Sequence, residues 1–94
     1  MKRVIRTSTY LNDLNAIEAR IEAQGSPQAG ADLWLYIDDQ VALLADPNHP
    51  RRRGLVVPGA IELVAHENYL VILEEDAASV TALNVLHVKR KYPI

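Results

Sequence analysis

The chain has 94 residues, with ten lysines and arginines against twelve aspartates and glutamates, and 49% of its residues are hydrophobic. This length supports one hydrophobic core, so we expect a single domain over residues 1–94. A formal net charge of -2 argues against a protein that binds wholly through nucleic-acid phosphates. The lack of cysteine excludes disulfides, thiolate metal ligands and thiol catalysis. No apolar run has the length of a membrane span and no signal-peptide pattern is present, so we expect a cytoplasmic protein without membrane contact.

The first half of the chain predicts a short strand and then two helices. Residues 2–6 are typical of a strand, and residues 7–9 offer hydroxyls that can cap a helix. Two sets of apolar residues then recur at helical spacing: Tyr10, Leu14, Ile17 and Ile21, followed by Leu33, Ile37, Val41 and Leu44. Gly25 separates the two sets, and Ser26-Pro27 is typical of a new helix start. This pattern predicts a helix hairpin that ends at Asp46-Pro47.

The second half of the chain predicts a loop and three strands. Residues 46–59 contain three prolines and three consecutive arginines, which indicates a loop. Short apolar segments at 60–65, 69–73 and 80–88 are separated by polar turns, and such short connections favour antiparallel neighbours. The expected fold is therefore α+β, a helix hairpin packed on a small antiparallel sheet in the order β-α-α-β-β-β.

Nine of the ten basic residues fall in three triplets, and Arg20 stands apart. The triplets are Lys2, Arg3 and Arg6; Arg51, Arg52 and Arg53; and Lys89, Arg90 and Lys91. If they converge in space, the protein has one basic face, and if they do not, they keep strands and loops soluble. The acidic pairs have simpler interpretations: Asp38-Asp39 as a solvated helix face, and 74–76 as a polar hairpin tip.

No cofactor or metal is expected. The three histidines, His49, His66 and His87, share no ligand spacing, and no phosphate-binding loop or nucleophile motif is present. The segment from His87 to Tyr92 combines an imidazole, three cations and a ring that can stack on a base. These groups suit a metal-free ribonuclease, although the same pattern also fits the packed end of a strand.

Two stretches of the second half carry recognisable motifs. The first stretch, 57–72, holds Val57-Pro58-Gly59 followed by Glu62-Leu63 and then Asn68-Tyr69. The second, 83–93, holds Val85-Leu86-His87 followed by Arg90 and Tyr92-Pro93. Together they resemble the RelE/ParE toxin superfamily, and more narrowly its ParE branch. The resemblance extends to residues 41–47, at the end of the helix hairpin, and so covers nearly the whole chain.

The resemblance implies a type II toxin that a small ParD-like antitoxin neutralises, with DNA contacted mainly through the antitoxin. ParE-type members inhibit DNA gyrase by binding, whereas RelE-type members cut mRNA on the ribosome without a metal. Ile61 stands where many relatives carry an arginine of the nuclease site. Together with the net charge of -2, it favours the gyrase inhibitor. A third possibility is an inactive homologue that only binds antitoxin.

The resemblance also implies two sets of contact residues. For the target we expect Arg51, Arg52, Arg53, His87, Lys89, Arg90, Lys91 and Tyr92. In the nuclease alternative His87 is the acid/base, Arg90 with residues 51–53 binds phosphate, and Tyr92 stacks on a base. For the antitoxin, which should lie along the helix hairpin and the sheet edge, we expect Leu14, Ile17, Ile21, Leu33, Trp34, Tyr36 and Ile37.

Overall fold

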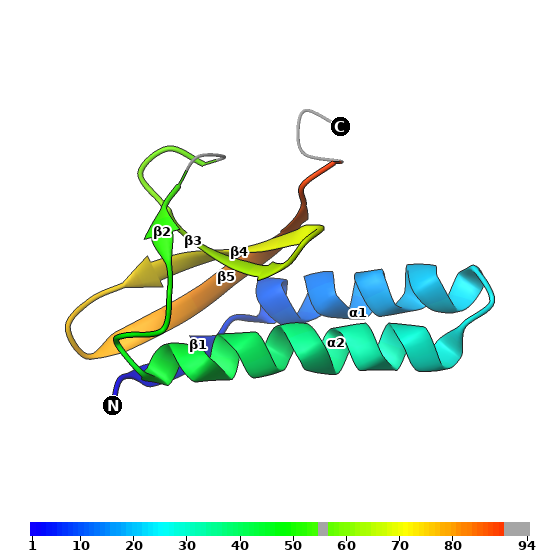
Figure 1. Cartoon of the computed structure of the whole chain (residues 1–94), viewed down its shortest axis with the longest axis horizontal. Coiled ribbons are helices and arrows are strands. Elements are labelled where there is room, and N and C mark those ends of the chain that lie inside the picture. Colours follow the sequence, from blue (N-terminus) through cyan, green and yellow to red (C-terminus); the bar gives the residue numbers. More distant parts are fainter. Residues whose placement is uncertain (55–56, 90–94) are drawn as a thin grey trace.

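The computed structural model describes residues 1–54 and 57–89, and it packs two helices against one face of a five-stranded sheet (Figure 1). The predicted α+β class and the helix hairpin are thereby confirmed. The elements follow one another as β1 (Arg3–Arg6), α1 (Ser8–Ala23), α2 (Pro27–Ala42), the short 3-10 helix η1 (Leu43–Ala45), β2 (Arg52–Arg53), β3 (Ile61–His66), β4 (Tyr69–Glu75) and β5 (Ser79–His87).

The helix ends lie where local sequence signals place them. The Thr7 hydroxyl accepts the Tyr10 amide at 3.1 Å at the start of α1, and the Ser26 hydroxyl accepts the Ala29 amide at 3.3 Å at the start of α2. Gly25 adopts a φ of +99°, a conformation that glycine takes without steric cost. Gly25 and Ser26 set the tight turn between the two helices, whereas Thr7 fixes the start of α1.

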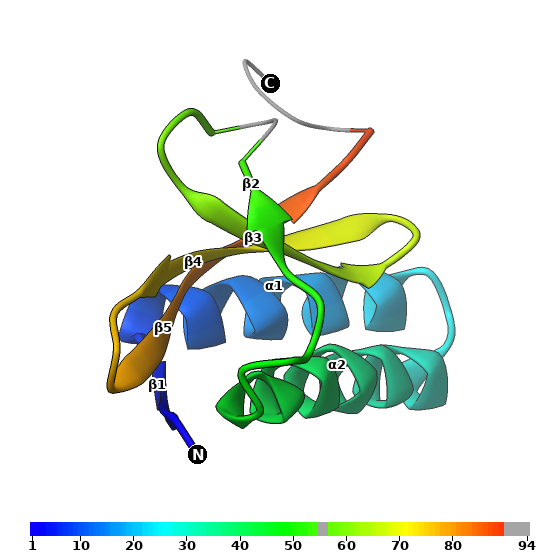
Figure 2. The same cartoon turned by 60° about the vertical axis from the view of Figure 1, so that its left-hand side comes forward.

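The sheet is mixed, with the strand order β1-β5-β4-β3-β2. Strands β3, β4 and β5 form the predicted antiparallel meander, but β1 pairs with β5 in parallel, with Arg3 opposite Ser79. The prediction of a purely antiparallel sheet was therefore wrong. The whole helix hairpin lies between β1 and the meander in sequence, and such a long crossover allows parallel pairing (Figure 2).

The loop prediction fails at Arg52 and Arg53. These two residues form β2 and pair with β3, Arg52 opposite Glu62 and Arg53 opposite Ile61. The Gly54 amide then donates to the Ala60 carbonyl at 2.7 Å. A strand of two residues has no periodicity of its own, so only its pairing with β3 reveals it.

The core lies between the helix hairpin and the sheet. Both predicted helix stripes contribute to it, and β3, β4 and β5 supply the opposite wall. Residues with no measurable exposure include Tyr10, Leu14, Ile37, Val41, Leu44, Val71, Val80 and Ala82. The two helices approach closely at Gly30, where an added Cβ would lie 2.9 Å from the Glu18 carbonyl oxygen. In residues 1–54 and 57–89 no helix is long and apolar enough to span a membrane.

Candidate functional site

The three consecutive arginines lie in three different environments. The Arg51 side chain is only 10% exposed and binds the Glu75 carboxylate at 2.8 Å. The Arg52 side chain is 47% exposed and donates through Nε to Glu62, whose side chain is fully buried, at 3.1 Å. Arg53 is exposed on the surface. The three arginines of the predicted target-binding set therefore differ in exposure. Arg51 is largely covered by contacts within the chain, Arg52 is half exposed, and Arg53 is exposed.

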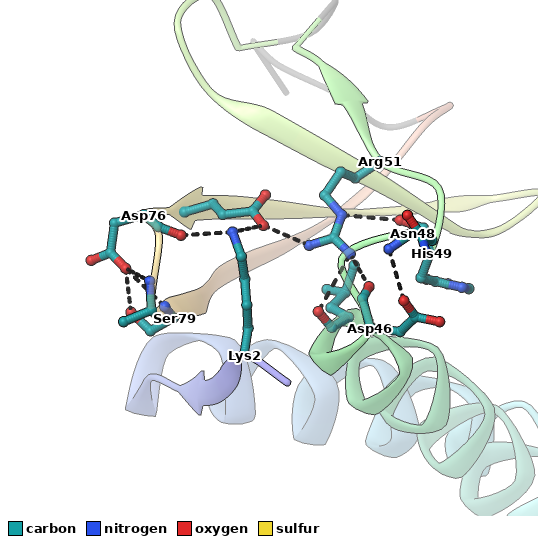
Figure 3. Close-up of polar contacts among 10 residues, drawn as sticks. Lys2, Asp46, Asn48, His49, Arg51, Asp76 and Ser79 are labelled. Atoms are coloured by element: carbon teal, nitrogen blue, oxygen red, sulfur yellow. Dashed lines mark hydrogen bonds and ion pairs between the residues drawn. The ribbon is translucent and has the colours of Figure 1, made fainter.

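Glu75 joins Lys2, which directly precedes β1, to Arg51, and Figure 3 shows these two cations with their contacts as dashed lines. Its Oε2 atom accepts from Lys2 Nζ at 2.7 Å and from Arg51 Nη1 at 2.8 Å, and its side chain is 14% exposed. Lys2 also donates to the Asp76 carbonyl at 2.7 Å. The prediction that Glu75 is part of a solvated hairpin tip was wrong, because two cations from distant parts of the chain cover it.

Asp38 is likewise not a solvated helix residue. Its Oδ1 atom accepts from Arg6 Nε at 2.7 Å and from the Tyr10 hydroxyl at 2.9 Å. Burial and the hydrogen bond to Asp38 raise the pKa of the Tyr10 phenol, and the same carboxylate raises the pKa of Arg6. In the described part of the chain, Lys2, Arg6, Arg51 and Arg52 thus pair with carboxylates and do not pool into one free basic face.

His87 lies at the end of β5, beside two residues that the sequence analysis did not select. Its ring packs edge-on against Tyr69 with 5.0 Å between ring centroids, and Arg20 Nη2 donates to the Tyr69 hydroxyl at 3.1 Å. His87 Nδ1 accepts the Lys89 amide at 3.1 Å, which places the proton of the neutral ring on Nε2. A cavity of about 360 Å³ opens here, lined by Asp13, Ala16, Ile17, Arg20, Tyr69, Val85, Leu86 and His87.

This site brings together an imidazole, a guanidinium and a phenol from α1, β4 and β5. No local pattern could predict it, since Arg20 and Tyr69 are 49 positions apart. Lys89 is exposed two residues beyond His87. The predicted target residues Arg90, Lys91 and Tyr92 lie outside the described residues. Among residues 1–54 and 57–89, no cluster of three or more acidic or histidine side chains is placed to hold a metal ion.

The predicted antitoxin contacts also need revision. Leu14 and Ile37 are fully buried under the sheet, so the inclusion of these two was wrong for the isolated fold. Tyr36 is 48% exposed, and the other four predicted residues are partly buried: Ile17, Ile21, Leu33 and Trp34. Helical periodicity selects the face that packs on the sheet, and that face is largely covered.

Three exposed apolar residues were missed, Leu35, Leu43 and Val64, at 56%, 49% and 50% exposure. Val64 also lines a cavity of about 320 Å³ with Gln40, His49, Pro50, Arg51, Arg52, Glu62 and Leu63. Since β2 covers β3 only at Ile61 and Glu62, the rest of this edge has no neighbouring strand among the described residues. The sheet therefore presents an open backbone edge on the strand that carries the exposed Val64.

No family model matches the sequence, and no curated protein matches it. Among solved structures, the chain is similar to one chain of the chromosomal ParDE TA system from P. aeruginosa. The TM-score is 0.80 and the identity 21%, and the match covers 94% of this chain and 97% of the other. The two chains share one fold over almost their whole length.

Proposed function

We propose that this chain is the toxin of a type II toxin–antitoxin pair and that it acts by binding DNA gyrase, as ParE-type proteins do. The observation that carries the proposal is the shared fold with a chain of the ParDE system, which extends over 94% of the residues. The motifs around residues 57–72 and 83–93 support the same assignment from the sequence side.

The proposed antitoxin surface consists of Tyr36, Leu43 and Val64, together with the open edge of β3. These side chains are each about half exposed, and the cavity lined by Val64 lies next to the edge. An extended segment that pairs with β3 would satisfy its free backbone groups and cover the exposed Val64. The partly buried residues Ile17, Ile21, Leu33 and Trp34 border the hairpin and remain proposed contacts.

The proposed target surface consists of Arg52, Arg53 and Lys89, with His87 at its margin. Arg53 and Lys89 are exposed, and the Arg52 side chain is half exposed although its Nε donates to buried Glu62. Arginine donors in this position can bind carboxylates of a protein partner in a bidentate manner. Arg90, Lys91 and Tyr92 belong to the same proposal on sequence grounds.

The test combines growth with an enzyme assay. Induction of this chain without antitoxin should arrest bacterial growth, and co-expression of a cognate ParD-like antitoxin should restore it. Purified protein should inhibit gyrase supercoiling, and an Arg52→Gln, Arg53→Gln variant should inhibit it less. Unaffected supercoiling at excess protein would refute gyrase as the target, and normal growth would instead indicate an inactive homologue.

The cavity around His87 favours one alternative, a ribosome-dependent mRNA endonuclease. The 2′-oxygen would attack the phosphorus and solvent would take its proton, while His87 Nε2–H would protonate the leaving 5′-oxygen. Arg20 would stabilise the negative charge that develops on the phosphate. Primer extension on translated mRNA should then reveal cleavage that His87→Ala abolishes and His49→Ala, in the loop after α2, does not. An absence of cleavage, or equal cleavage by both variants, would exclude this alternative.

A further inference from the structure

We propose that Glu75 is a positioning residue for the two solvent-facing arginines. By holding Arg51, its carboxylate would fix the start of β2, and thereby the direction in which Arg52 and Arg53 meet a partner. The arginine run is then not one uniform basic segment, since its first member anchors the other two.

Arg51 is held by four hydrogen bonds that together use all three of its nitrogen atoms (Figure 3). Nη1 donates to Glu75 Oε2 at 2.8 Å, and Nε donates to the His49 carbonyl at 3.0 Å. Nη2 donates to the carbonyls of Asp46 at 2.6 Å and Leu44 at 3.3 Å. Two of these carbonyls lie at the end of the α2–η1 helical segment, where a cation also interacts favourably with the helix dipole.

This anchor matters because β2 is intrinsically weak. The strand contains two residues and makes only two residue pairs with β3, too few to be stable by themselves. Arg51 directly precedes β2 in the chain. Fixing its guanidinium therefore restricts the backbone from which Arg52 and Arg53 project.

Glu75 is the charged group on which the anchor depends. It neutralises both Arg51 and Lys2, and all three side chains are less than a fifth exposed. Removing the carboxylate leaves two cations close together with little water around them, which disfavours the observed arrangement. Lys2 thus connects the N-terminal strand to the same anchor.

The partner that this arrangement fits is an acidic protein segment. Arg52 is held by Glu62 through Nε and Arg53 is exposed, and both project from the backbone that the Arg51 anchor fixes. Fixed donors recognise carboxylates with less loss of side-chain entropy than mobile donors do. The identification of that partner as DNA gyrase rests on the proposed function.

Amide hydrogen exchange tests the positioning step without any partner. In Glu75→Gln, the Gly54 amide that donates to Ala60 should exchange about tenfold faster than in the wild type. The control is Glu74→Gln, which removes the same charge from an exposed neighbour and should leave the rate unchanged. If Glu75→Gln does not fold, Arg51→Lys serves as the second variant, because lysine keeps the positive charge but lacks the planar set of guanidinium donors. It should accelerate exchange of the Gly54 amide to the same extent. Unchanged Gly54 exchange in the folded variant overturns the proposal.

A double-mutant cycle tests the consequence for binding to DNA gyrase. Glu75→Gln should weaken binding about tenfold in the wild-type background and by less than about twofold in an Arg53→Gln background, because the two changes act through one contact. If Glu75→Gln reduced the affinity equally in the wild type and in Arg53→Gln, the proposed role of Glu75 in recognition would be overturned. If the wild-type chain does not bind that protein at all, the proposed function fails, and the Gly54 exchange rates still decide the positioning step.

Discussion

The Tyr10 hydroxyl in α1 donates to the Asp38 carboxylate in α2 at 2.9 Å, inside the interface between the helix hairpin and the sheet. Arg6 of β1 donates to the same carboxylate oxygen, so one acidic side chain joins three elements. Because the Tyr10 side chain has no measurable exposure, its hydroxyl depends on this acceptor for a hydrogen bond.

Tyr10→Phe should lower the free energy of unfolding by about 1.5–3 kcal/mol at pH 7, the range for a hydrogen bond to a charged group. Burial and the bond to Asp38 raise the pKa of Tyr10, so the folded chain keeps the phenol protonated where the unfolded chain ionises it. This contribution is complete below about pH 10 and is lost as the pH rises toward the folded pKa. In urea unfolding, the free energies of unfolding of the wild type and of Tyr10→Phe should therefore become more similar above about pH 10. A difference that stays constant to high pH would contradict this linkage.

Gly30→Ala should destabilise the fold by about 1–3 kcal/mol, the usual cost of overpacking. The new Cβ would lie 2.9 Å from the Glu18 carbonyl oxygen, so α1 and α2 would have to separate. Helix propensity alone predicts the opposite sign, a gain of up to about 1 kcal/mol. The control, Ala29→Gly, changes an exposed position in the same turn and should cost about 0.5–1 kcal/mol. A neutral or stabilising Gly30→Ala in thermal unfolding would refute the close contact.

Asp76 should titrate below its usual range. Its carboxylate accepts the amides of Ala78 and Ser79, both at 2.8 Å, and these bonds lower its pKa. The stability it contributes is present above the unfolded pKa, about 3.9, and is lost as the pH falls through the folded value. NMR titration of the side-chain carboxyl carbon measures the pKa directly. Ser79→Pro removes two donors, the Ser79 amide and the Ser79 hydroxyl, and should move the midpoint upward, and an unchanged midpoint would argue against these hydrogen bonds as the cause.

Substitutions at the exposed residues Leu43 and Val64 should change antitoxin affinity without changing the stability of the fold. Leu43→Ser and Val64→Ser should weaken antitoxin binding about tenfold, while unfolding changes by about 0.5 kcal/mol or less. Leu14→Ala, at a predicted contact that is buried, should instead cost about 2–5 kcal/mol of stability. Calorimetric titration and urea unfolding of the same preparations measure both quantities. Normal antitoxin affinity in Leu43→Ser and Val64→Ser would remove these two residues from the interface.

The features that the sequence predicted correctly depend on near neighbours in the chain. Thr7, Gly25 and Ser26 act on backbone groups within three positions, and their residue types determine what they can do there. The meander follows from short turns between apolar segments. For this reason the helix ends and the order of the main elements could be read without coordinates.

The features that were missed depend on contacts between distant residues. Nothing near Glu75 in the sequence shows that Lys2 and Arg51 bind its carboxylate. Likewise, nothing near Asp38 shows that Arg6 and Tyr10 bind it. The sequence therefore predicts a polar hairpin tip and a solvated helix face at these two positions. The same reason hides the association of Arg20 with Tyr69. Leu14 was assigned to an interface because an apolar stripe does not tell whether the sheet of the same chain or a partner covers it.

The parallel pairing of β1 with β5 also constrains the order of events during synthesis. Arg3 to Arg6 lie opposite Ser79 to Ala82, so the first strand of the sheet has no partner until the last strand has been made. Loop closure over that separation is slow compared with the formation of the helix hairpin. On the ribosome, Val4 and Ile5 therefore lack their strand partners Val80 and Thr81 until β5 has been made.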